Sequence, residues 1–175
     1  MKKLLTLTFY FFILNSYADD EFKIEQIKKI TEGTYDLIEW RDGDKVFVPP
    51  EATARFIMAD GFLMFTAFKA DGKNKVGFAN WGEYEFTNGT FSYGYSETLT
   101  ISTDNEEISV SKVAPYWTVD MILPNMRNFK ITHDKDRVKF TYKKALFDFN
   151  KNGLIYTDYN TGSVRKYVRA QKNKK

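Results

Sequence analysis

Apolar and polar residues alternate along most of this chain, and the alternation is clearest on either side of Asp60-Gly61. An Asp-Gly pair between two apolar runs is among the strongest sequence signals for a two-residue β-hairpin loop. Such a loop pairs Phe56 with Phe65 and Met58 with Leu63, which places these four side chains on one face. A hairpin cannot bury an apolar face alone, so the pattern predicts a curved sheet with one interior face.

The same alternation predicts further strands before and after this hairpin. They are expected within residues 34–42, 81–95, 98–113 and 127–143, with turns at residues 150–153 and 160–162 joining the last ones. About ten strands at this spacing are typical of a sandwich or barrel. Ahead of them, apolar residues recur at near-helical spacing from Phe22 to Ile30 and predict a short amphipathic helix that ends near Gly33. We expect this helix to cover the end of a barrel or to pack on its outside.

Three local features qualify this pattern. The apolar positions of the first strand fall out of step between Leu37 and Ile38, which predicts a bulge. Residues 69–75 are polar and contain a glycine, a composition typical of a loop at a barrel mouth. Further along, alternation predicts that Leu99 and Ile101 point inward.

The first residues have the three parts of a secretory signal peptide. Lys2 and Lys3 precede an apolar run over residues 4–14, and the small residues Ser16 and Ala18 precede an acidic start. Export machinery recognises this arrangement, and the run is too short to span a bilayer. An uncleaved anchor or a buried N-terminal helix are the alternatives.

These signals divide the chain into a signal peptide (residues 1–18), one barrel domain (residues 19–170) and a basic tail (residues 171–175). No later segment is long and apolar enough to cross a bilayer, so we expect no stable membrane span after cleavage. The net charge of the 175 residues is only +3. Two lysines would leave with the signal peptide, so charge gives no reason to expect a nucleic-acid partner.

The chain contains no cysteine and a single histidine, His133, which lies in a polar turn. This composition excludes disulfides and a cysteine nucleophile, and it leaves zinc hydrolysis and histidine-based triads without their parts. We therefore expect no metal and no cofactor. An exported domain without a disulfide favours bacterial export, with a periplasmic or secreted location.

Three groups of residues follow one another at the spacing of a known family. They are Gly82-x-Tyr84-x-Phe86-x-Asn88-Gly89-x-Phe91, Pro115-x-Trp117 and Arg127-x-Phe129-x-Ile131. In this order they resemble the bacterial lipocalin-like domain family over residues 33–142, with Tyr35 where that family has a tryptophan. The resemblance implies a barrel closed at one end with room for a small apolar molecule, a use that small barrels support. The predicted fold is thus all-β: a small antiparallel lipocalin-like β-barrel with a short N-terminal helix after a cleaved signal peptide.

The candidate ligand-binding residues are four aromatic rings and one cation. Tyr93, Tyr95, Tyr116 and Trp117 have amphipathic rings near a proline-interrupted loop, and such rings offer a guest an apolar face and a hydrogen bond. Arg127 is in phase with the apolar residues two and four positions later, so its guanidinium should face the interior. There it needs an acid, an aromatic ring or an anionic ligand group.

The function predicted from these features is binding of a small hydrophobic or amphiphilic molecule inside an exported barrel, and the pattern specifies no oligomeric state. One alternative is an enzyme of isomerase or cyclase type, which would place Glu39, Glu97 or Asp120 inward beside Tyr35 or Tyr95.

The other alternative is a protein-binding or inhibitory barrel that acts through its loops. It would expose an apolar patch around Ile57, Phe62 and Met64, which belong to the outward phase of the hairpin.

Overall fold

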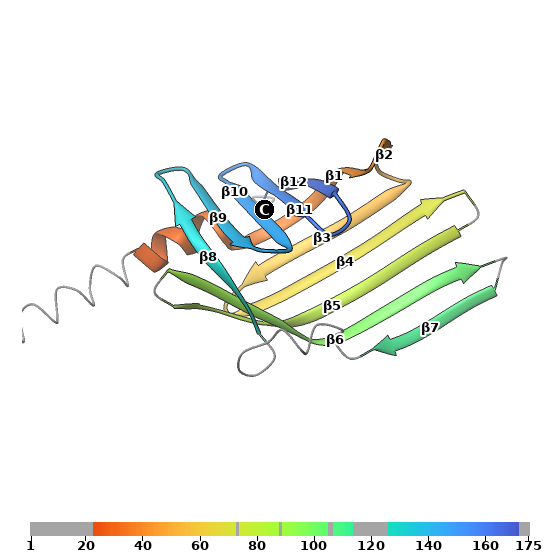
Figure 1. Ribbon diagram of the computed structural model, residues 1–175, viewed down its shortest axis with the longest axis horizontal. Coiled ribbons are helices and arrows are strands. Elements are labelled where there is room, and N and C mark those ends of the chain that lie inside the picture. The colour runs from red at the N-terminus through yellow and green to blue at the C-terminus, as the bar shows by residue number, and fades with distance from the viewer. Residues whose placement is uncertain (1–22, 73, 88, 105–106, 114–125, 172–175) are drawn as a thin grey trace, which may run out of the picture.

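Ten strands of the computed structural model close into an antiparallel β-barrel (Figure 1). The structure describes residues 23–72, 74–87, 89–104, 107–113 and 126–171, so the predicted signal peptide and residues 172–175 of the tail lie outside the described residues. The strands are β1 (Gly33–Asp42), β2 (Lys45–Phe47), β3 (Ala52–Ala59), β4 (Phe62–Asp71), β5 (Asn74–Thr87), β6 (Thr90–Asp104), β7 (Glu107–Val113), β8 (Arg127–His133), β9 (Arg137–Tyr142), β10 (Ala145–Asn150), β11 (Gly153–Asp158) and β12 (Ser163–Arg169). The expected all-β barrel with a short helix is confirmed.

The ring follows chain order except at two strands. It runs β1, β3, β4, β5, β6, β8, β9, β10, β11 and β12, and β12 pairs with β1 to close it. β2 pairs with β1 outside the ring, and β7 pairs with the second half of β6, whose first half pairs with β8. β4 to β7 therefore extend well past the short strands β8 to β12 (Figure 1).

The hairpin around Asp60-Gly61 forms with the predicted register. Phe56 pairs with Phe65 and Met58 with Leu63, and none of these four side chains is more than 7% exposed. The loop residues have φ angles of 51° and 81°, the left-handed geometry whose twist matches the flanking strands. Here alternation and turn chemistry were enough to predict which face is buried.

The bulge predicted in β1 is also present. The register with β12 shifts between Leu37 and Glu39, so Ile38 is the extra residue. Ile38 is 50% exposed, whereas Trp40 is only 6% exposed. The bulge thus returns Trp40 to the interior, where it contacts the site described below.

A second bulge, in β6, overturns one prediction. The register between β5 and β6 shifts by one at Gly82, which leaves Ser96 as the extra residue. A Cβ on Gly82 would lie 1.8 Å from the carbonyl oxygen of Gly94, so only glycine fits this close approach. Because the bulge reverses the phase beyond it, Leu99 and Ile101 point outward, contrary to the expectation, and 42% of Ile101 is exposed.

The loop predicted over residues 69–75 is replaced by strand. β4 continues to Asp71 and β5 begins at Asn74, and their cross-strand pairs run without a break to the turn. Gly72, at φ 63°, allows this tight connection. Backbone pairing with a neighbouring strand therefore outweighs the polar composition of the segment.

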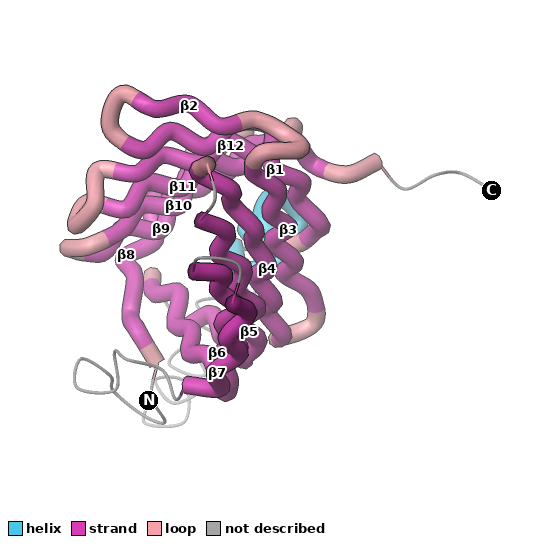
Figure 2. The backbone as a smooth tube through the Cα atoms, turned by 90° about the vertical axis from the view of Figure 1, so that its right-hand side faces the viewer, coloured by secondary structure: helices cyan, strands magenta, loops and turns pink. Residues whose placement is uncertain are grey.

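The helix of residues 23–31 lies across one end of the barrel (Figure 1), and Figure 2 shows it behind the strands at the far end. Ile27 joins the core with 5% of its surface exposed. The single proton of the Tyr35 hydroxyl is shared between two carbonyl oxygens of the last helical turn, at 3.1 and 2.8 Å. Arg169 donates to the carbonyl of Glu32. These donors satisfy carbonyls that a helix end leaves unpaired, and they fix the helix as a plug.

Aromatic rings fill the half of the barrel next to this helix. Phe91 stacks on Phe140 with ring centroids 4.2 Å apart, and Tyr35 meets Phe149 edge-on at 5.7 Å. All four are at most 1% exposed, and both arrangements are favourable for ring quadrupoles. Any space for a guest must therefore lie toward the opposite end. Among the described residues, no helix is long and apolar enough to cross a membrane.

Candidate functional site

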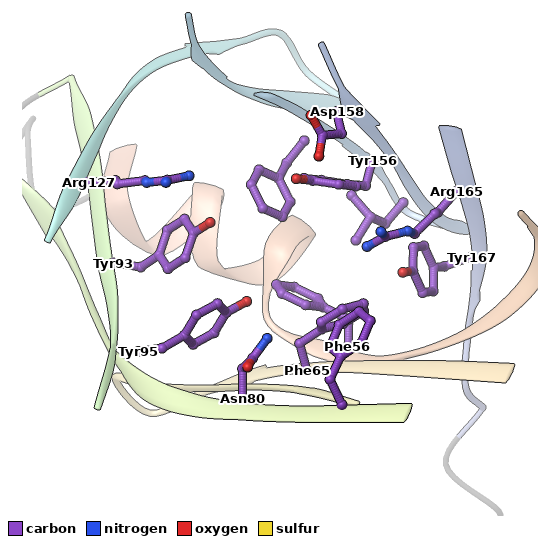
Figure 3. A pocket seen from close by; sticks show the side chains of 13 residues that line it. Phe56, Phe65, Asn80, Tyr93, Tyr95, Arg127, Tyr156, Asp158, Arg165 and Tyr167 are labelled. Atoms are coloured by element: carbon purple, nitrogen blue, oxygen red, sulfur yellow. The ribbon is translucent and has the colours of Figure 1, made fainter. Parts of the chain in front are cut away.

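A cavity of about 120 Å³ lies inside the barrel, with the helix behind it (Figure 3). A single buried water needs only roughly 15 Å³, so this space admits a small organic group. Its apolar wall consists of Phe56, Phe65, Phe78, Phe147 and Leu154. Tyrosine rings complete the wall and bring hydroxyl groups: Tyr93, Tyr95, Tyr156 and Tyr167. An apolar lining with a few placed polar groups is typical of small-molecule sites.

Four polar side chains converge on this cavity from four different strands. They are Asn80 of β5, Arg127 of β8, Asp158 of β11 and Arg165 of β12. Arg127 and Arg165 point into the cavity from opposite walls (Figure 3). Two guanidinium groups and one carboxylate give the described lining a net positive charge, which favours an anionic guest group over a cationic one.

Aromatic faces surround the guanidinium of Arg165. Its Cζ lies 4.0 Å from the ring centroid of Trp40, 5.3 Å from that of Tyr156 and 5.4 Å from that of Phe65. Trp40 is held in turn by a 2.8 Å hydrogen bond from its Nε1 to the Ser163 hydroxyl. Cation–π contacts stabilise the charge but leave the N–H donors in the guanidinium plane to find acceptors.

Tyr167 lies two residues after Arg165 on the same inner face and is 5% exposed. Burial raises the pKa of its hydroxyl well above the ordinary value, while the charge of Arg165 and a hydrogen bond with that side chain act in the opposite direction. Burial is the larger effect, so Tyr167 stays neutral at physiological pH. A neutral hydroxyl can accept from Arg165 and donate to a guest.

Asn80 and Thr98 are cross-strand partners that form a polar corner of the barrel interior. They are 8% and 9% exposed. Within the described part of the chain, Asn80 Oδ1 and Thr98 Oγ1 have no hydrogen-bond partner. A buried oxygen left unsatisfied costs roughly 1–3 kcal/mol, so this corner favours a guest or a water that can donate to it.

The structure brings together three of the five residues that the sequence singled out. Tyr93, Tyr95 and Arg127 line the cavity, and Arg127 also lies 5.7 Å from a tyrosine ring of β9. The inward orientation of Arg127 is as predicted, while the part of all three residues in ligand binding stays a prediction. Tyr116 and Trp117 lie outside the described residues.

Sequence reasoning missed the polar residues of the last strand and of β5. The alternation of β12 could have indicated them. Ser163, Arg165 and Tyr167 lie on the same face of the strand, and Ser163 and Tyr167 are both buried. Asn80 had no comparable signal, because a lone asparagine in a strand more often faces solvent.

The position of Glu39 bears on the enzyme alternative. Glu39 pairs on the outer surface with Lys166 at 2.9 Å and Arg41 at 3.5 Å. The hydrogen bond from Lys166 is the main reason why the pKa of Glu39 lies below its usual value. Glu39 is thus not an inward acid beside Tyr35, contrary to what that alternative requires. Asp120 and the side chain of Glu97 lie outside the described residues.

Metal-binding side chains do not cluster in the described part of the chain, where no group of three or more His, Asp or Glu residues could hold an ion. His133 is exposed at the end of β8, as expected for a turn. The functional interpretation therefore rests on the geometry of the cavity. No model of a known protein family, no curated protein and no solved structure matches this chain.

Proposed function

We propose that this chain is an exported lipocalin-like barrel protein that binds one small hydrophobic or amphiphilic molecule in the cavity between the aromatic core and the barrel mouth. The carrying observation is the cavity itself, whose aromatic walls enclose about 120 Å³ and whose polar groups converge from four strands. Packed rings fill the helix end of the interior, so the space for a guest inside the described barrel lies on the side away from the helix. The cavity is partly open, so this volume holds the polar head and the adjoining part of a guest, and a longer chain or a further ring can extend toward the barrel mouth.

Export is proposed from the first residues of the sequence alone. The cationic start, apolar run and small-residue site over residues 1–18 support cleavage after Ala18. Intact-mass analysis of the protein recovered from its native host would give a chain that begins at Asp19. A full-length chain retained in the cytoplasm would contradict this part of the proposal.

Ligand binding is tested with the mature chain and a neutral fluorescent probe, N-phenyl-1-naphthylamine, with 1-octanol as competitor. We expect saturable probe fluorescence and its displacement by octanol. Native mass spectrometry of protein purified from its host would add the mass of a co-purifying guest. A chain that neither binds the probe nor carries a guest would refute the proposal.

A cavity-filling variant places the binding inside the barrel. Asn80→Phe directs a ring into the cavity and should abolish probe binding, whereas Thr132→Phe adds the same ring at an exposed position of β8 and should leave it unchanged. Circular dichroism and melting curves confirm that both variants are folded. Equal probe binding by both would place the probe elsewhere.

A second candidate function, protein binding, is supported by an apolar patch on the outer face of β4 and β5. Phe62 is 66% exposed, and the cross-strand partners Met64 and Trp81 are 37% and 39% exposed. Patches of this kind commonly mark interaction surfaces. Phe62→Lys should then abolish retention of a protein partner isolated from the native host while leaving probe binding unchanged. A partner that the variant retains equally well would remove this candidate.

A further inference from the structure

Arg165 differs from the arginines on the outer surface of the barrel in what its guanidinium contacts. Arg55 donates to the Asp36 carboxylate at 2.6 Å, and Arg137 donates to both oxygens of Asp148 at 2.6 and 2.5 Å. Arg165 forms no ion pair with any carboxylate of the described residues, and its buried Nε has no hydrogen-bond partner among them. The guanidinium of Arg165 therefore lies in an apolar wall without a carboxylate of the described residues to accept its two parallel N–H groups.

The acid of the described cavity lining, Asp158, accepts hydrogen bonds through one of its two oxygens from its own turn. Asp158 Oδ1 accepts hydrogen bonds from the backbone N–H groups of Asn160 at 2.8 Å and Thr161 at 3.4 Å. These bonds hold the carboxylate in the turn between β11 and β12. From the opposite wall, Arg127 adds a second positive charge to the cavity (Figure 3). The positive charge of the cavity and the Arg165 donor that the described residues leave unused thus both favour binding of an anion from outside the chain.

The surroundings of Arg165 also limit the kind of anion. The Tyr167 hydroxyl lies beside the guanidinium, so an oxygen anion could accept from both groups. Rings of Phe56, Phe65 and Phe78 form part of the apolar wall and suit a hydrocarbon chain. The cavity of about 120 Å³ and its small positive excess favour a single negative charge.

We propose, on the basis of the proposed function, that Arg165 and Tyr167 form an anion subsite that binds the carboxylate of a small amphiphilic monocarboxylic acid. The guanidinium fork donates two parallel hydrogen bonds to the carboxylate, and the Tyr167 hydroxyl donates a third. The hydrocarbon part lies against the phenylalanine wall. Arg127 contributes attraction across the cavity.

The test compares octanoate with 1-octanol as competitors of N-phenyl-1-naphthylamine at neutral pH. Wild type should prefer octanoate by at least about tenfold, the ratio expected for hydrogen bonds to a charged group. Arg165→Met should remove this preference, while octanol affinity stays within about twofold. Arg41→Met, which removes an exposed arginine of β1, is the matched charge control and should keep the preference.

A second measurement needs no variant. [1-¹³C]octanoate is titrated with acid and followed by NMR in the presence of wild-type protein. The pKa of the bound carboxyl group should lie about one unit or more below the pKa of free octanoic acid. An unshifted titration would overturn the anion subsite even if Arg165→Met does not fold. Octyl phosphate competing more strongly than octanoate would overturn the assignment to a carboxylate.

The outcomes separate the two proposals. If wild type binds neither the probe nor octanol, the proposed function fails. If probe binding is normal but octanoate and octanol compete equally, the proposed function stands and the anion subsite fails.

Discussion

Replacing Asn80 by leucine should stabilise the unliganded protein, although Asn80 lies in the proposed site. The side chain is 8% exposed, and its Oδ1 has no hydrogen-bond partner among the described residues. Folding therefore removes this oxygen from water without replacing the lost hydrogen bond. Leucine has a similar size, carries no polar atom and is better suited to a buried strand position.

The expected gain follows from the cost of the unsatisfied oxygen, roughly 1–3 kcal/mol. For a chain of this size each kcal/mol shifts the melting temperature by about 2–4 °C, so the melting temperature should rise by about 2–12 °C. Urea unfolding followed by circular dichroism measures the free energy of unfolding directly. The same variant should bind polar guests more weakly, because the cavity loses an acceptor.

Asn128 of β8 is the matched control, since its Oδ1 does have a partner. It accepts a 2.6 Å hydrogen bond from the hydroxyl of Ser92, which is 4% exposed. Asn128→Leu leaves that buried hydroxyl unpaired and should lower the free energy of unfolding by roughly 1–3 kcal/mol. If Asn80→Leu lowers it as well, an ordered water must satisfy Asn80, and our account of the polar corner is refuted.

Two further predictions concern the framework. Burial raises the pKa of Tyr35 from 10.0 to about 12, so the folded protein keeps a proton that the unfolded chain loses. This contribution to stability is complete below about pH 10 and falls by roughly 3 kcal/mol between about pH 10 and pH 12, and equal urea midpoints at about pH 9 and pH 11.5 would contradict it. Gly82→Ala places a Cβ 1.8 Å from the carbonyl oxygen of Gly94. It should lower the free energy of unfolding by at least about 2 kcal/mol, measured by urea unfolding, and an unchanged midpoint would show that the β6 bulge tolerates a side chain.

The sequence predicted the parts of the fold that local chemistry determines. Asp60-Gly61 set the register of β3 and β4, because the loop type and the buried face both require the same pairing. The bulge at Ile38 was visible because the apolar positions of β1 change phase within a few residues. In both cases the evidence for the structure lies in neighbouring residues.

Other features depend on contacts between distant segments and left little trace in the sequence. The β6 bulge at Ser96 arises where Gly82 approaches the neighbouring strand, so the phase of Ile101 could not be predicted from β6 alone. The environment of Arg165 likewise requires Trp40, which comes from the other end of the chain and meets it only because β12 pairs with β1. Sequence alternation could show that Arg165 faces inward, but not which groups surround it.

The two ends of the barrel contribute differently to stability, and the packing at the helix end offsets the cost of the unsatisfied polar groups at the mouth. At the helix end, donors from Tyr35 and Arg169 satisfy the helix carbonyls while stacked rings exclude water. Such packing supplies stability that does not depend on a guest. At the mouth, Asn80 and Arg165 retain hydrogen-bonding capacity that the described residues do not satisfy, which lowers the stability of the unliganded protein. Because a guest relieves that deficit, binding should raise the melting temperature, and the rise should shrink in Asn80→Leu even though that variant starts out more stable.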